Sequence, residues 1–276
     1  MVCTGNRNDR KDSMTTRTSQ ETVELADGVS IPLIGFGTWQ LTGNDAYNGV
    51  RAALEIGYRH IDTATAYRNE DRVGAAIRDS GVGRENVFVT TKLPAGNVGR
   101  ERQTLDDSLR ALGVDFVDLW LVHWPPNGEA RPETWKAFIE ARERGKTRAI
   151  GVSNYSIAQI DELIDATGRA PALNQIPWNP FRYDAEEVAA LKSRHVTLEG
   201  YSPLLDSDLS DPVLSGIAAA HGKTAAQVIL RWHVEHGFVV IPRSRRRERI
   251  EENFAIFDFE LSSDELRQLD ELGTAA

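Results

Sequence analysis

The sequence predicts a single α/β domain that folds as a (β/α)8 TIM barrel. Short apolar runs with strand character alternate with amphipathic helical stretches, and the runs recur at intervals close to the ~30 residues of a β-α-β unit. The connections are short, which favours a closed parallel barrel over an open doubly wound sheet. The eight apolar runs end near Phe36, Asp62, Lys92, His123, Ser153, Ile176, Tyr201 and Pro242.

Two segments precede the first repeat. Residues 1–20 are polar and lack the apolar core of a secretory signal, so we expect a mobile tail in which Met14 is a candidate alternative start. The following segment places Asp27 and Gly28 between two apolar runs, which is the signal of a two-residue hairpin turn. The barrel domain is therefore expected to span residues 21–276, with an N-terminal β-hairpin and no second domain.

Caps and glycines set the expected limits of the helices. We expect Asn44 to cap the first helix, whose apolar stripe stops at Gly57. Two later stripes of leucine and isoleucine stop at Gly113 and Gly168. Glycine is common at such positions because it adopts the left-handed conformation without strain. Each of these helices therefore has one apolar face and a defined end.

The C-terminal third departs from the simple repeat. The longer interval after the seventh strand adds an irregular segment and an extra helix, on the face where barrel active sites are built. Thr224 and Gln227 form a capping box for the next helix. After the eighth strand we expect a helix around Ile250 to Phe254 and a last helix from Ser262 to Leu272, with Ser262 and Glu265 as its capping residues.

Composition restricts the functions to be considered. With 41% hydrophobic residues the chain can bury a large core, and its net charge of −9 argues against general attraction to nucleic acid or to an anionic membrane. Cys3 is the only cysteine, so neither a disulfide framework nor a cysteine metal site can form. No run is apolar enough to span a membrane. We therefore expect a cytoplasmic monomer that binds neither nucleic acid nor membrane.

Four polar side chains stand close to the ends of successive predicted strands. Asp62, Lys92 and His123 end strands two, three and four, and Tyr67 lies five residues after the first of these. Each residue alone has an ordinary structural explanation, as a loop cap, a surface lysine, a core histidine or a packed tyrosine. Because the carboxyl ends of barrel strands converge on one mouth, the four together predict an active site there.

These side chains can give a proton to a carbonyl oxygen while a hydride reaches the carbonyl carbon. A free tyrosine titrates near ~10, so a cation such as Lys92 must stabilise the phenolate of Tyr67 at neutral pH. Asp62 would keep Lys92 charged in a partly desolvated pocket. A neutral His123 would orient the substrate carbonyl by a hydrogen bond. The pattern predicts a carbonyl reductase.

Seven segments, between about residue 22 and residue 260, carry a further signal, and they read in order GYRHIDTATAYRNE, VTTKLP, LVHWP, IGVSNY, LNQIPWNP, GYSPL and IPRSRRRERIEEN. This series resembles the signature blocks of the aldo-keto reductases, most closely those of the bacterial 2,5-diketo-gluconate reductase group. The resemblance implies a (β/α)8 barrel that binds NADPH in an extended form without a Rossmann fold. In agreement, no G-x-G-x-x-G follows a predicted strand.

The resemblance also assigns roles to residues at the barrel mouth. Tyr67 would be the general acid, tuned by Lys92 and Asp62. His123 would orient the substrate. Residues at the ends of strands five to seven would hold the nicotinamide, although a serine-asparagine pair at such a place is otherwise typical of a helix cap. These cofactor residues are Ser153, Asn154, Gln175, Tyr201, Ser202 and Leu204, with Tyr201 stacked on the ring.

A basic cluster follows the eighth strand, where five of the seven residues 243–249 are arginine. Such a run is usually a solvated face, but this one opens a helix directly after a strand, and a helix start with forked cations suits a phosphate monoester. An arginine replaces the lysine that is common in the family at the first of these positions, and the charge is kept. The resemblance assigns the 2′-phosphate of NADPH to Arg243, Ser244 and Arg249, and the adenine side to Glu252 and Asn253.

Two tryptophans are expected to line the substrate pocket. Trp39 follows the first strand and Trp124 follows His123, so both would form walls beside Tyr67. The resemblance implies that substrate choice depends on the loops after strands four and seven and on the C-terminal tail. For this family all three are short here, even with the extra helix after strand seven, which predicts an open mouth suited to small aldehydes, dicarbonyls and keto sugars. Residues 177–179 depart from the residues that are usual in the family. We expect this departure to affect the local packing but not the cofactor contact of Gln175. The tryptophans expected in the core are Trp120, Trp135 and Trp232.

The residues leave other functions open. A Schiff-base aldolase would use Lys92 as a nucleophile, but it needs a neutral amine, whereas Asp62 favours a charged one. A regulatory subunit that binds NADPH with little turnover is disfavoured because all four catalytic positions are filled. A metal hydrolase has the least support, since His60 and Asp62 lack the additional histidines that such a site needs. No metal is expected.

Overall fold

Parallel strands follow one another in sequence order around a barrel. The computed structural model describes residues 21–274, so the predicted tail at residues 1–20 lies outside the described part of the chain. In the described part, one sheet has the order β10-β9-β8-β7-β6-β5-β4-β3, and every pair in it is parallel. Its strands are β3 Phe36–Gly37, β4 His60–Asp62, β5 Phe88–Leu93, β6 Val117–Val122, β7 Thr147–Ser153, β8 Leu173–Pro177, β9 Thr197–Tyr201 and β10 Val239–Ile241.

The sheet closes on itself next to its first and last strands. Ile34, just before β3, forms a parallel bridge with Val240 of β10. The backbone N–H of Gly35 donates to the carbonyl of Val240 at 2.8 Å, and that of Gly37 donates to the carbonyl of Pro242 at 3.1 Å. These bonds join the two edges of the sheet, and the predicted (β/α)8 barrel is confirmed.

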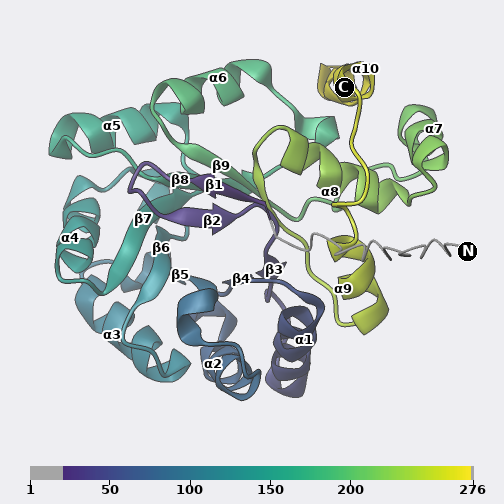
Figure 1. The fold of residues 1–276 in the computed structure, drawn as a ribbon. Helices are drawn as coiled ribbons and strands as arrows, with labels where there is room; N and C mark the ends of the chain where they lie inside the picture. Colours follow the sequence, from purple (N-terminus) through teal and green to yellow (C-terminus); the bar gives the residue numbers. More distant parts are fainter. Residues whose placement is uncertain (1–20, 275–276) are drawn as a thin grey trace, which may run out of the picture.

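Helices surround the strands (Figure 1). Their apolar stripes pack on the barrel, because a helix with one apolar face must bury that face against another layer. The α-helices are α1 Gly43–Ile56, α2 Glu70–Asp79, α3 Glu101–Leu112, α4 Pro132–Glu143, α5 Ile157–Thr167, α6 Ala185–Ser193, α7 Pro212–His221, α8 Ala225–Glu235, α9 Arg247–Phe254 and α10 Ser263–Asp270. Short 3-10 helices are η1 Thr65–Tyr67, η2 Arg84–Asn86, η3 Ala95–Asn97, η4 Pro126–Gly128, η5 Pro180–Arg182 and η6 Glu271–Thr274.

Most of the predicted helix signals are observed. Gly113 and Gly168 end α3 and α5 in the left-handed conformation, both with φ 70°. The capping boxes that begin with Thr224 and Ser262 are both formed. The expected cap at Asn44 is wrong, because α1 already begins at residue 43 and Asn44 therefore lies inside its first turn.

A hairpin of two short strands, β1 Thr22–Glu24 and β2 Ser30–Pro32, precedes the barrel. The hairpin is confirmed, but its turn has three residues instead of the predicted two. The N–H of Gly28 donates to the carbonyl of Leu25 at 2.8 Å, and the N–H of Leu25 donates to the carbonyl of Val29 at 2.9 Å. Gly28 has φ 73°, which provides the left-handed residue that ends a three-residue hairpin loop.

The hairpin covers the N-terminal ends of the barrel strands and is seen in front of them in Figure 1. Asp27, at its tip, forms ion pairs with Arg142, at 3.3 Å, and with Arg169, residues that precede β7 and β8. It also accepts a hydrogen bond from the backbone N–H of Ile150 at 3.3 Å. With this end covered, the opposite end of the barrel is the accessible one.

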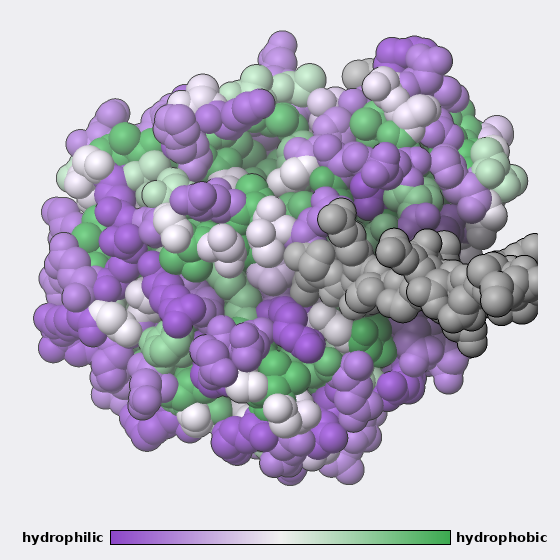
Figure 2. Space-filling view, in the orientation of Figure 1, coloured by the Kyte–Doolittle hydropathy of each residue, from purple (hydrophilic) through white to green (hydrophobic). Residues whose placement is uncertain are grey.

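The core contains the tryptophans that were expected there. Trp120, Trp135 and Trp232 are at most 1% exposed, and the rings of Trp120 and Phe138 are stacked. Figure 2 shows the hairpin end of the molecule, where hydrophilic side chains predominate and hydrophobic ones are scattered between them. Among residues 21–274, no helix has the length and apolar character required to cross a membrane.

Candidate active site

A cavity of about 620 Å³ opens at the C-terminal ends of the barrel strands. The ends of strands β4, β7, β8, β9 and β10 and the loops after them contribute to its walls, as expected for a barrel active site. We call this cavity the mouth. It is lined by Gly37, Trp39, Asp62, Ala66, Tyr67, His123, Trp124, Ser153, Asn154, Gln175, Tyr201, Ser202, Pro203, Leu204, Leu205, Ile241, Pro242 and Arg243.

A buried ion pair lies at the base of the mouth. The amine of Lys92 donates to both carboxylate oxygens of Asp62, with Nζ–Oδ1 and Nζ–Oδ2 distances of 2.6 and 2.7 Å. Its third hydrogen bond goes to the backbone carbonyl of Thr63 at 2.9 Å. Lys92 is fully buried and Asp62 is 1% exposed, so the pair is largely removed from water. The three donors of an ammonium group are all satisfied.

Tyr67 and His123 lie above this pair. The Lys92 nitrogen is 5.2 Å from the centre of the Tyr67 ring. The rings of Tyr67 and His123 meet edge to face, with 5.6 Å between their centres and 75° between their planes. The structure thus brings together the four residues that the sequence singled out for catalysis.

The short helix η1 that carries Tyr67 is tied to β5, the strand that carries Lys92. The hydroxyl of Thr65 donates to the backbone carbonyl of Lys92 at 3.0 Å. Glu70 begins the next helix and accepts hydrogen bonds from Thr91 at 2.6 Å and from Ser108 at 3.1 Å. Sequence analysis did not identify this polar network, which fixes the loop after β4 relative to β5.

Burial and charge shift the titration of these groups. Burial raises the pKa of Tyr67, and the charge of Lys92 opposes the rise without cancelling it. Burial by itself would lower the pKa of Lys92, but the charge of Asp62 and its hydrogen bonds, with contributions from Tyr67 and Glu199 when these ionise, outweigh it, so the pKa lies above its ordinary value. Burial and then the charge of Lys92 lower the pKa of His123 to about 3. At neutral pH the tyrosine is protonated, the lysine charged and the histidine neutral.

Two side-chain amides lie on the other side of the mouth. Asn154, with φ 64°, donates from Nδ2 to the carbonyl of His123 at 3.1 Å and to the hydroxyl of Ser153 at 2.9 Å. Its Oδ1 accepts a hydrogen bond from the Tyr201 hydroxyl at 2.9 Å. Gln175 donates from Nε2 to Asp62 at 2.9 Å. The predicted nicotinamide residues therefore form a connected group next to the ion pair.

A second carboxyl, which sequence analysis missed, lies below the mouth. Glu199 of β9 is fully buried, and its Oε2 accepts a hydrogen bond from Gln175 Nε2 at 3.1 Å. Its Oε1 is 3.9 Å from Nε2 of the buried His60, which is 3.0 Å from the Thr90 hydroxyl. The only signal in the sequence was a glutamate inside an apolar run, where a charged residue is seldom left unpaired.

The basic cluster lies beside the mouth, and its arginines differ in their pairing. Arg243 lines the cavity with its guanidinium 5.8 Å from the Trp39 ring centre, and it pairs with no carboxylate among the described residues. Arg247 is paired with Glu55 at 2.7 Å and with Glu251 at 3.0 Å. Arg249 is more than half exposed and has only a 3.8 Å contact with a carboxylate, that of Glu252. Ser244 precedes α9, and Glu252 and Asn253 lie on it.

The rim of the mouth is apolar. Trp39, Trp124 and Leu205 line it and are 48%, 52% and 59% exposed. Asn179 donates from its side chain to the carbonyl of Leu205 at 3.2 Å and so anchors the loop after β9. Trp178 is buried. Residues 177–179, where the sequence departs from the family's usual residues, thus contribute a buried side chain and a contact to the rim.

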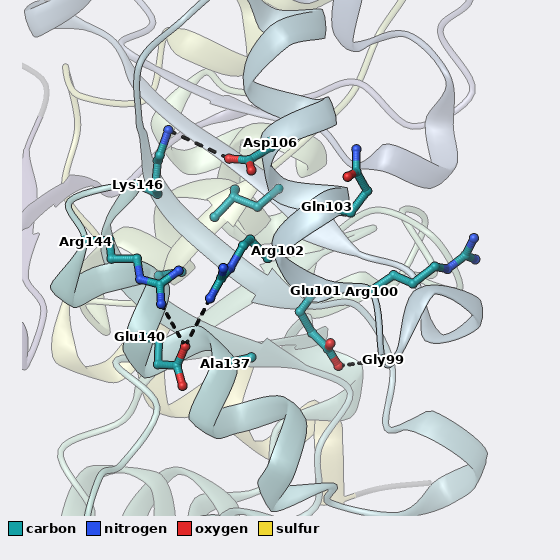
Figure 3. A pocket seen from close by; sticks show the side chains of 12 residues that line it. Gly99, Arg100, Glu101, Arg102, Gln103, Asp106, Ala137, Glu140, Arg144 and Lys146 are labelled. Atoms are coloured by element: carbon teal, nitrogen blue, oxygen red, sulfur yellow. Dashed lines mark hydrogen bonds and ion pairs between the residues drawn. The ribbon is translucent and has the colours of Figure 1, made fainter.

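Another depression, between α3 and α4, lacks such a constellation (Figure 3). Its charges pair with one another, because Arg102 and Arg144 contact Glu140 at 3.8 and 3.4 Å and Lys146 contacts Asp106 at 3.7 Å. We regard it as a solvated surface. Within residues 21–274, no group of three or more histidine, cysteine, aspartate or glutamate side chains is arranged to hold a metal ion.

Known proteins resemble this chain over most of its length. The model of the aldo/keto reductase family matches residues 33–274. An aldo-keto reductase of Mycolicibacterium smegmatis is 46% identical over 256 residues, which cover 91% of this chain and 93% of that protein. Methylglyoxal reductase DkgA of Escherichia coli K12 is 40% identical over 254 residues, which cover 91% and 92%. Morphine 6-dehydrogenase of Pseudomonas putida is 42% identical over 269 residues, which cover 91% of each chain.

Solved structures agree with the sequence comparisons. The crystal structure of an aldo/keto reductase from Brucella melitensis has a TM-score of 0.88 and 44% identity, and the match covers 92% of this chain and all of that one. An aldo-keto reductase from Bombyx mori in complex with NADP has a TM-score of 0.86 and 33% identity, with 91% and 92% covered. The chain belongs to the aldo/keto reductase family and is an oxidoreductase that acts on carbonyl groups.

Proposed function

We propose that the protein uses NADPH to reduce small aldehydes, dicarbonyls and keto sugars to alcohols, as a cytoplasmic monomer. One observation carries the proposal: at the base of an open cavity, Asp62 binds the ammonium of Lys92, and this ammonium lies close to the ring of Tyr67. This arrangement offers a proton to a carbonyl oxygen and a charge that stabilises the phenolate left behind. The relatives named above, which include a methylglyoxal reductase, support the same chemistry.

The residues present fit a nicotinamide cofactor. Gln175 and Asn154 aim amide groups at the mouth, and the Tyr201 ring borders it from the next strand. Arg243 has no carboxylate partner among the described residues, and Arg249, like Arg246, has only a 3.8 Å contact with a carboxylate, so Arg243 and Arg249 are available to the 2′-phosphate. When bound, NADPH would supply the hydride that reaches the carbonyl carbon. A family member with bound NADP supports this assignment.

In this proposal, Tyr67 donates its proton to the substrate oxygen as negative charge develops there. Burial keeps the pKa of Tyr67 high, so the proton is present at neutral pH. The ammonium of Lys92, held by Asp62, stabilises the resulting phenolate. His123 is neutral and can donate one hydrogen bond to the same oxygen, which orients the carbonyl against the amide side of the mouth.

The rim supports small carbonyl substrates. Trp39, Trp124 and Leu205 offer apolar surface to a short hydrocarbon or sugar edge, and all three remain accessible from outside. The exposed apolar rim is also compatible with a larger flat substrate, in line with the morphine 6-dehydrogenase relative. We therefore include a bulky alicyclic ketone among the test substrates.

A Schiff-base aldolase is disfavoured by the geometry around Lys92. All three amine hydrogens are bonded to oxygen, and the surrounding charges raise its pKa, whereas a nucleophilic lysine must lose a proton.

The proposal is tested by following NADPH absorbance with methylglyoxal, phenylglyoxal, aromatic aldehydes, diketo sugars and one alicyclic ketone. Wild-type protein is expected to oxidise NADPH with at least one of the small carbonyls, and the Tyr67→Phe variant is expected to be slower by about 10² to 10⁴. Equal rates in the two proteins, or no oxidation with any carbonyl by a wild type that binds NADPH, would refute the proposal.

A further inference from the structure

Glu199 is a buried carboxyl that the proposed reaction does not use. It stands directly beside Gln175 in the register of β8 and β9. The nitrogen of the Gln175 amide donates to Glu199 Oε2 at 3.1 Å and to Asp62 Oδ2 at 2.9 Å. A single amide group therefore links Glu199 to the ion pair of Asp62 and Lys92.

These two contacts fix the orientation of the Gln175 amide. An amide nitrogen carries two hydrogens, and here one is directed to each carboxyl. If the amide were turned over, its oxygen would face the Asp62 oxygen that now accepts its N–H, and its hydrogen bond to Glu199 would be lost as well. The observed orientation places both hydrogen bonds of the Gln175 side chain on its nitrogen and leaves Oε1 without a hydrogen-bond partner among the described residues.

Asn154 is constrained in the same sense. Both hydrogens of its Nδ2 are used, by the His123 carbonyl and by the Ser153 hydroxyl. Both amides that border the mouth therefore keep their N–H groups inside the protein and present oxygen. The Asn154 oxygen already accepts from the Tyr201 hydroxyl, so Oε1 of Gln175 is the unpaired acceptor of the two. An unpaired acceptor suits a ligand with a primary amide NH2, whereas a methyl ketone at the same place would leave it without a partner.

We propose that Glu199 is a positioning residue for the cofactor, which holds the Gln175 amide so that its oxygen accepts a hydrogen bond from the carboxamide NH2 of the nicotinamide. This inference rests on the proposed use of NADPH. Glu199 touches neither substrate nor hydride, and it acts through Gln175. Sequence position gives no indication of this role, because the contact depends on strand register.

The charges around Glu199 are compatible with this role. His60 and Asp62 face it from β4 and Lys92 from β5, while its neighbour in register on β10 is the apolar Val239. Burial, and then the charge of Asp62, raise the pKa of Glu199 to about 8. At neutral pH it is therefore a protonated acid whose Oε2 accepts from Gln175, and Lys92 is left to balance Asp62 alone.

The test compares two cofactors that differ in one group, NADP+ and its 3-acetylpyridine analogue, in which a methyl ketone replaces the carboxamide. Dissociation constants are measured by quenching of tryptophan fluorescence, without turnover. Wild-type protein should bind NADP+ about tenfold more tightly than the analogue, which is the usual effect of one or two unpaired hydrogen-bonding groups. The ratio of the two dissociation constants, analogue over NADP+, is the quantity to compare. Glu199→Gln keeps an acceptor and should keep this ratio at about ten, whereas Glu199→Leu should bring it close to one.

Glu70→Gln is the matched control, because Glu70 is also a buried carboxyl but is bonded to Thr91 and Ser108 instead of Gln175. It should leave the ratio unchanged. If the leucine variant does not fold by circular dichroism, Glu199→Thr, which is too short to reach Gln175, takes its place. Glu199→Gln, which has nearly the same shape as the wild-type side chain, is a second test. If this variant no longer binds NADP+ more tightly than the analogue, the proposal is wrong.

The outcomes also separate this inference from the proposed function. A wild-type ratio near one, or an unchanged ratio in the folded Glu199→Leu or Glu199→Thr protein, would overturn the role of Glu199 even if carbonyl reduction is normal. Conversely, a protein with the expected ratios and no carbonyl-dependent oxidation of NADPH would refute the proposed function and leave the positioning role in place.

Discussion

Lys92 and Asp62 form a two-oxygen ion pair between neighbouring strands, in a place that is largely removed from water. The Nζ–Oδ distances are 2.6 and 2.7 Å, and Lys92 is fully buried. Removing two charges from water is unfavourable unless each finds its partners, and here the amine has a third acceptor in the Thr63 carbonyl. Asp62 thus holds the ammonium of Lys92 in a fixed place below Tyr67.

The first prediction concerns Tyr67→Phe, which removes only the proton donor. We expect the turnover number to fall by about 10² to 10⁴, the usual contribution of general acid catalysis. The dissociation constant for NADPH, measured by fluorescence quenching, should change little. Tyr47→Phe is the control, since it deletes a tyrosine hydroxyl that is bonded to Asp79 on the surface. Substantial turnover in Tyr67→Phe with a normal pH profile would exclude Tyr67 as the acid.

The second prediction concerns Lys92→Met. Loss of the ammonium leaves Asp62 buried without its cation, which typically costs about 3–5 kcal/mol, so the melting temperature should drop together with turnover. Borohydride and a carbonyl substrate should trap no adduct on the wild-type protein. Lys136→Met, at an exposed lysine paired with Glu133, serves as control. A stoichiometric, substrate-dependent mass increase at Lys92 would instead establish the aldolase mechanism.

The third prediction separates two arginines of the basic cluster. Arg249→Ala should raise the Michaelis constant for NADPH about tenfold or more and leave that for NADH nearly unchanged, because the guanidinium is free to bind a 2′-phosphate. Arg247→Ala should have little effect on either cofactor, since Glu55 and Glu251 already neutralise that side chain. Equal losses with NADPH and NADH in Arg249→Ala would show that the cluster does not recognise the 2′-phosphate.

The fourth prediction links Glu199 to the pH dependence of stability. The pKa of this carboxyl is raised from 4.5 to about 8, so between these values the unfolded chain binds fewer protons than the folded one. Its contribution to the free energy of unfolding is therefore complete below about pH 4.5 and is lost as the pH rises to about 8. Glu199→Gln cannot ionise. Its melting temperature relative to wild type should increase from about pH 5 to pH 8, and a constant difference would contradict this pKa.

Much of the fold could be predicted because local signals and barrel topology agree. The polar residues Asp62, Lys92 and His123 come at the ends of apolar runs, so strand ends and site residues were found together. Errors arose where one signal fits two geometries. An Asp-Gly pair suits a two-residue turn or a three-residue loop, and a polar residue such as Asn44 can precede a helix or lie in its first turn.

The buried half of the site could not be predicted. Glu199 and Gln175 are 24 residues apart in the chain, and their contact exists only because β8 and β9 align them in register. The register of two parallel strands depends on how the long connection between them packs, so no pattern within either strand reports this contact. Similarly, the sequence shows five arginines after the eighth strand but cannot show that Arg247 is held by close carboxylates whereas Arg249 has only a 3.8 Å contact.

The bridge between Ile34 and Val240 has a consequence for how the protein is made. The first barrel strand leaves the ribosome about two hundred residues before its second partner, at synthesis rates of about 5–20 residues per second. During that interval the growing sheet has an unpaired parallel edge, which is a template for association with other chains. Asp62 and Lys92 are synthesised early, yet Gln175 and Glu199 join them only later. Chaperone dependence during translation, with little need for chaperones afterwards, is the expected cellular signature of this closure.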